Sequence, residues 1–105
     1  MASLDERLAR LRKSAENVRR ATNPHQRTAA LRFLATRGQE LEAERDRLLH
    51  KLDNGWDWLD LNPGADGYAD LEARYLGWLG EYERICDALR DAQDIWTRPN
   101  GGMAA

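Results

Sequence analysis

Residues 68–96, YADLEARYLGWLGEYERICDALRDAQDIW, decide the fold of this chain. Apolar side chains recur there in alternating steps of three and four residues, at Tyr68, Leu71, Tyr75, Trp78, Tyr82, Ile85, Leu89, Ala92 and Trp96. This spacing is the seam of a coiled-coil heptad pattern, held for about four repeats. Leu76, Leu79 and Cys86 flank the seam and widen the apolar stripe. Because such a stripe must be buried against other helices, residues 66–96 are predicted to form one long helix of an all-α protein.

A second long helix is predicted over residues 24–54. Asn23 is a favoured N-cap, Pro24 suits the first helical position, and Gln26 completes a capping-box pattern. Glycine at position 55 favours a left-handed C-terminal residue, which would end the helix. The apolar seam of this helix contains one glycine and one charged residue: Leu31, Leu34, Gly38, Leu41, Arg45, Leu48 and Leu52.

A shorter helix is predicted over residues 3–22, with Ser3 and Glu6 as a capping box. The very short turn at Asn23 favours an antiparallel arrangement of the first two helices. Residues 55–65 are predicted to be a loop, with Asp66 as the N-cap of the last helix. The chain is thus expected to be one helical domain over residues 1–97, followed by a flexible tail over residues 98–105.

The two long helices are predicted to form an antiparallel hairpin. A loop centred near residue 60 makes the numbers of facing residues add to about 120. Large rings of the last helix would then lie opposite small or flexible residues of the second. The predicted neighbours are Leu52 with Tyr68, Arg45 with Tyr75, Gly38 with Tyr82, and Leu41 with Trp78.

The helix lengths predict that one end of the hairpin is uncovered. The first helix would be about 28 Å long and the other two about 45 Å, so it would reach only the level of residues 42–43. An uncovered apolar patch usually marks an interface. We therefore predict a non-enzymatic protein–protein interaction module, self-associating as a homodimer or binding a partner helix. The predicted interface residues are Leu48, Leu49, Leu52, Trp56, Leu71, Tyr75 and Leu76. The alternative is that Trp56, Trp58 and Leu59 cover this end from within the loop.

The charge distribution suggests a second function. Residues 1–52 contain 12 basic and 7 acidic side chains, whereas residues 53–105 contain 4 and 11. An Arg-rich segment, 7–37, favours phosphate contacts, so an accessory nucleic-acid-binding protein is the alternative. Its candidate contacts are Arg7, Arg10, Arg12, Lys13, Arg19 and Arg20. On a helical wheel these side chains spread around the polar side, which weakens the hypothesis. A basic first helix lying on a membrane is also conceivable, but it lacks aromatic anchors.

The sequence gives no support for catalysis, metal binding or a cofactor. His25 and His50 do not follow a carboxylate at the Glu-x-x-His spacing of di-iron bundles, and the acidic loop lacks the spacing of a calcium site. No catalytic, cofactor-binding or metal-ligating residue is therefore predicted. The lone Cys86 is typical of a small buried side chain. No segment has the length of a membrane span, and a cytoplasmic protein is expected.

Overall fold

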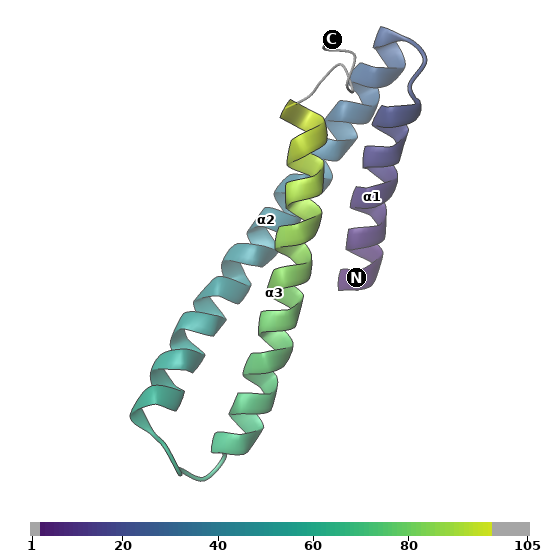
Figure 1. Cartoon of the computed structure of the whole chain (residues 1–105). Coiled ribbons are helices and arrows are strands. Elements are labelled where there is room, and N and C mark those ends of the chain that lie inside the picture. The colour runs from purple at the N-terminus through teal and green to yellow at the C-terminus, as the bar shows by residue number, and fades with distance from the viewer. Residues whose placement is uncertain (1–2, 98–105) are drawn as a thin grey trace.

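The computed structural model describes residues 3–97, which form three helices lying alongside one another (Figure 1). They are α1 (Leu4–Arg20), α2 (Pro24–Leu61) and α3 (Tyr68–Thr97). The described residues contain no strand, so the predicted all-α fold is confirmed. The long helices α2 and α3 run antiparallel as a hairpin, and the shorter α1 packs against both of them. The predicted flexible tail, 98–105, lies outside the described residues.

Side-chain caps determine where α1 and α2 begin. Ser3 Oγ and Asn23 Oδ1 each accept a hydrogen bond from the backbone N–H three residues further on, at 3.2 and 2.9 Å. Each bond satisfies an amide that the start of a helix leaves without a backbone partner. The Gln26 side chain reaches back and accepts from the backbone N–H and the hydroxyl of Thr22, which ties the turn to the start of α2. The chain therefore reverses direction immediately after α1.

The end of α2 differs from the prediction. The helix continues through Asn54 and Gly55 to Leu61, about two turns further than expected. Gly55 is therefore a buried helical residue and not a left-handed terminator. Most of the predicted 55–65 loop is helix, because the apolar seam continues past Leu52 at the same spacing, through Gly55 to the buried Leu59.

The turn between the long helices occupies residues 62–67. Gly64 and Gly67 have φ angles of 77° and 82°, a region that side chains with a Cβ rarely adopt. The Leu71 N–H donates to the Gly67 carbonyl at 3.0 Å, which makes Gly67 the residue before the first helical position. The prediction of Asp66 as the N-cap is thus off by one residue, and α3 begins at Tyr68.

Because the turn lies further along the chain, the hairpin register also differs from the prediction. The numbers of facing residues add to about 130 instead of about 120. Tyr75 packs against Gly55 and Trp56, not against Arg45. The guanidinium of Arg45 lies close enough to influence Tyr82, two turns further along α3. The predicted Arg45–Tyr75 pair is therefore wrong.

The remaining predicted neighbours shift in the same direction. Tyr68 has its ring contact with Trp58, whose centroid is 6.5 Å away, and not with Leu52. The Trp78 ring lies under the Lys51 ammonium group, at 5.5 Å, instead of near Leu41. Rings of α3 do lie opposite a small residue of α2, as expected, but that residue is Gly55.

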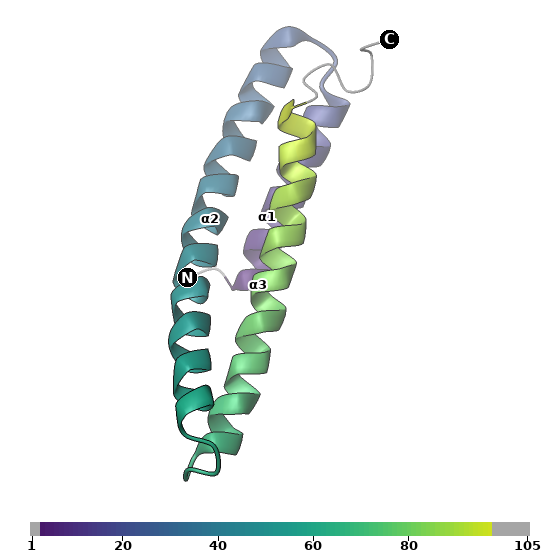
Figure 2. The ribbon, with the colours of Figure 1, turned by 60° about the vertical axis from the view of Figure 1, so that its left-hand side comes forward.

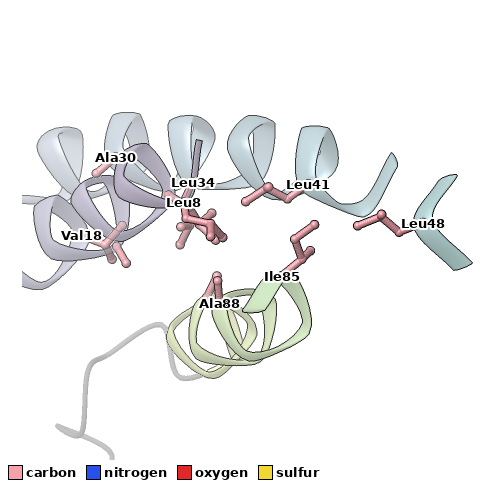
Figure 3. Packing of buried hydrophobic residues seen from close by; sticks show 11 residues of the cluster. Leu8, Val18, Ala30, Leu34, Leu41, Leu48, Ile85 and Ala88 are labelled. Carbon is pink, nitrogen blue, oxygen red and sulfur yellow. The ribbon is translucent and has the colours of Figure 1, made fainter. Parts of the chain in front are cut away.

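The core lies where all three helices meet, at the α1 end of the hairpin (Figure 3). Leu8, Leu41 and Ile85 come from the three different helices and are almost completely buried. The full cluster consists of Leu8, Leu11, Ala15, Val18, Ala30, Leu34, Leu41, Leu48, Ile85, Ala88 and Ala92. Burial of this apolar surface is the main driving force that holds α1 on the hairpin.

Candidate interaction surface

The first helix covers only part of the hairpin, as its length predicts. Near the start of α1, Asp5 forms an ion pair with Arg84 of α3, and Arg7 lies 3.6 Å from Glu44 of α2. These contacts mark the level at which α1 begins, close to the predicted level of residues 42–43. Beyond it, towards the turn at residues 62–67, α2 and α3 continue as a pair without α1 (Figure 1).

The seven predicted interface residues fall into three groups in the structure. Leu48 and Leu52 are buried between α2 and α3, with 2% and 6% of their surface exposed. Leu71 and Tyr75 are half-buried. The remaining three are exposed, with exposed fractions of 43%, 59% and 60% for Leu49, Trp56 and Leu76. A partner can reach these three, whereas the prediction that Leu48 and Leu52 are interface residues is corrected, because both belong to the interior of the hairpin.

The alternative prediction, that loop residues cover this end, describes part of what the structure shows. Leu59 is buried and fills the end of the hairpin. Trp58 contacts the Tyr68 ring, and Trp56 contacts the Tyr75 ring with centroids 6.2 Å apart. Both tryptophans nevertheless remain exposed in part, with exposed fractions of 59% for Trp56 and 37% for Trp58. The end is filled from within, but its outer surface remains apolar.

Two exposed apolar residues were missed at the sequence level. Leu61 at the end of α2 is largely exposed, and so is Phe33 near the other end of the same helix. The heptad spacing could have identified Phe33, since it lies outside the seam of α2. Leu61 lies in the predicted 55–65 loop, and its place on the surface of a helix follows only from the continuation of α2 past Gly55.

The two sides of the hairpin differ. On the side of α1, Glu44 pairs with Arg7, and further down the ammonium group of Lys51 covers the Trp78 ring. Figure 2 shows the other side, with α1 behind the α2/α3 pair. There Arg45 pairs with Asp46 at 3.4 Å, and both lie near Tyr82.

Tyr82 lies in an environment that shifts the pKa of its phenol. Interaction with the Cys86 side chain, one helical turn away, raises the pKa of the Tyr82 phenol. Partial burial acts in the same direction, and the nearby Arg45 guanidinium opposes both. A neutral phenol beside a half-buried thiol is suited to packing against an apolar partner.

The basic side chains proposed to contact nucleic acid do not form one surface. Arg7 pairs with Glu44, and Arg19 and Arg20 both pair with Glu16. Arg12 and Arg19 line a hollow between α1 and α3 that also contains Glu16 and Asp91. Arg10 and Lys13 are exposed on the outer side of α1. Positive charge is thus divided among several directions and is partly neutralised within the chain.

Within residues 3–97, no group of three or more His, Cys, Asp or Glu side chains is arranged to hold a metal ion. Both histidines are exposed. None of the described helices has an apolar stretch that would cross a membrane. Comparison of the chain with protein-family models, curated proteins and solved structures found no match.

Proposed function

We propose that this chain is a non-enzymatic interaction module, which binds a second copy or a partner helix through the turn end of the α2/α3 hairpin. The observation that supports it is the exposure of Leu49, Trp56 and Leu76 on the part of the hairpin that α1 does not cover. Tryptophan is enriched in the energetic centres of interfaces, and large apolar side chains gathered at one end are typical of a docking surface.

Buried residues and a ring contact support this surface from behind. Leu52, Gly55 and Leu59 are buried directly behind it, and the Trp56 and Tyr75 rings contact each other across the two helices. A surface that is already ordered loses little conformational entropy when a partner binds. Helix-in-groove docking or a four-helix arrangement of two hairpins would both bury the exposed side chains.

Site-specific photo-crosslinking tests the proposal. A photoreactive phenylalanine analogue replaces Leu49 or Leu76 in the full chain. In a control it replaces Phe33, which is at least as exposed as either position but lies at the α1 end. We expect a protein adduct from the first two positions and none from Phe33 in cells that express the chain. The mass of the adduct distinguishes a second copy from another protein. Equal labelling at all three positions, or none anywhere with a strict monomer in light scattering, would contradict the proposal.

A further inference from the structure

The α2/α3 pair has two long sides, and α1 lies on one of them. Glu44 points to the α1 side, where it pairs with Arg7. The next two residues, Arg45 and Asp46, lie near Tyr82 on the opposite side. Among residues 3–97 no helix covers that opposite side, which faces the viewer in Figure 2. We call it the open face.

Two rows of side chains border the open face. Their members recur in alternating steps of four and three residues, which place them along one edge of each helix. The α2 row is Glu42, Asp46, Leu49, Asp53, Trp56 and Asp60, and the α3 row is Glu72, Leu76, Leu79, Glu83, Cys86 and Arg90. Both rows combine apolar side chains with exposed carboxylates, four of them in the α2 row and two in the α3 row.

The charge of the open face is negative. The two rows contain six carboxylates and the guanidinium of Arg90, which already pairs with Asp87 at 3.5 Å. The neighbouring Arg45 is half-buried and paired with Asp46. Two such faces brought together would repel each other, since like charges opposed across an interface are unfavourable. A second copy docked face to face is therefore disfavoured.

A hollow continues the open face towards the α1 end of the hairpin. It has a volume of about 260 Å³ and is lined by α2 and α3 alone. Gly38 has no side chain to fill this space, and a Cβ added there would meet nothing within 4 Å. Its lining combines small and apolar residues with two glutamine amides and one carboxylate: Leu34, Ala35, Gly38, Gln39, Glu42, Leu89, Ala92 and Gln93. Such a hollow has room for a large apolar side chain of a docked helix.

The chain itself contains a helix of the kind that suits this pair. α1 packs an apolar stripe of Leu8, Leu11 and Val18 onto α2 and α3, and its Arg7 reaches a carboxylate of α2 at the border. We infer that the open face binds a basic amphipathic helix of a partner protein. The inference rests on the acidic rows that border the face, on the apolar side chains in those rows and in the hollow, and on the packing of α1 against the same two helices. This inference rests on the proposed function and adds the chemistry of the partner.

Binding of designed peptides to the full chain tests the inference. One fluorescent helical peptide of about 21 residues has leucine at heptad positions a and d and lysine at e and g, and the second has glutamate at e and g. The protein variants are Leu49→Gln on the open face and Phe33→Gln as a matched control, because both remove an exposed apolar side chain from α2 without adding charge. Fluorescence anisotropy is measured at low and moderate salt.

We expect the lysine peptide to bind and the glutamate peptide to bind at least about tenfold more weakly. Leu49→Gln should weaken binding of the lysine peptide about tenfold, and Phe33→Gln should leave it unchanged. Equal binding of both peptides, binding that does not depend on Leu49, or no binding at all would overturn the inference. If the chain self-associates and Leu49→Gln abolishes this self-association, the inference is overturned, but the proposed function is supported. Crosslinked protein adducts at Leu49 and Leu76 without binding of either peptide would support the proposed function and overturn the inference.

Discussion

Tyr75 packs directly over Gly55. A Cβ added to Gly55 would lie 3.3 Å from Tyr75 Cδ2 and 3.6 Å from Trp78 Cζ3. The missing side chain thus allows two rings of α3 to approach the backbone of α2. This contact explains why a glycine is found inside a long helix, where it costs on the order of 1 kcal/mol relative to alanine.

Two glycine-to-alanine substitutions separate helix propensity from this contact. Gly38→Ala should raise the free energy of unfolding by about 1 kcal/mol, because the new methyl group meets nothing within 4 Å. Gly55→Ala should raise the free energy of unfolding by less than this, or lower it, because the new methyl group pushes against the Tyr75 ring. Urea denaturation followed by circular dichroism measures both values.

The effect of Tyr75 is isolated by repeating Gly55→Ala in a Tyr75→Ala background. Without the Tyr75 ring, Gly55→Ala should raise the free energy of unfolding by about as much as Gly38→Ala does. Equal gains for the two single substitutions in the natural background would show that the Tyr75 contact does not constrain Gly55.

The same glycine explains which features the sequence could and could not predict. Three helices, their antiparallel order and the short reach of α1 follow from heptad spacing, caps and lengths, and all three are observed. Gly55 follows Asn54 and resembles a helix end, but the seam continues through it to Leu59. Packing of Tyr75 and Trp78 against Gly55 outweighs the unfavourable helix propensity of this glycine. One misplaced turn then shifted every predicted pair along the hairpin.

The accessible surface was harder to predict than the fold. A helical wheel shows that Leu48 and Leu49 point in different directions, but it does not show which sides of α2 are covered. That depends on the side of the hairpin on which α1 packs, which is a property of all three helices together. The prediction therefore identified the end of the hairpin that α1 leaves uncovered, but it included Leu48 and Leu52, which the structure buries.

Leu48 and Leu49 are adjacent in sequence but should respond differently to substitution. Leu48→Ala removes a side chain that is 2% exposed and should lower the free energy of unfolding by about 2–5 kcal/mol. Leu49→Ala should change it by no more than about 0.5 kcal/mol in the isolated chain, because 43% of the Leu49 surface is already exposed. Thermal denaturation of both variants at low protein concentration checks the difference. A large loss for Leu49→Ala would indicate that Leu49 supports the fold and is unsuited to act as a free docking residue.

The Tyr82 phenol should titrate above the ordinary pKa of tyrosine. The adjacent Cys86 side chain raises its pKa, so the fold favours the neutral phenol. The contribution to stability is present below the ordinary pKa of about 10 and is lost as the pH rises through the higher folded-state value. Absorbance at 295 nm, taken as the difference between the natural chain and Tyr82→Phe, isolates the transition. Cys86→Ala should lower the Tyr82 pKa, and an unchanged midpoint would exclude Cys86 as the cause.

The basic residues of α1 are expected to serve the fold more than a nucleic acid. Arg7, Arg19 and Arg20 pair with carboxylates of the chain, and Arg12 lies beside Glu16 and Asp91. Binding to phosphates would require these cations to be free and to face one direction. We therefore expect no salt-sensitive binding to generic duplex DNA or single-stranded RNA at low ionic strength. Glu16→Gln and Glu44→Gln together release four arginines, three of them in α1 and the fourth Arg47 of α2, and provide a sensitised control. Binding by the natural chain that falls steeply with salt, and that the outward-facing pair Arg10→Gln and Lys13→Gln removes, would restore the nucleic-acid hypothesis.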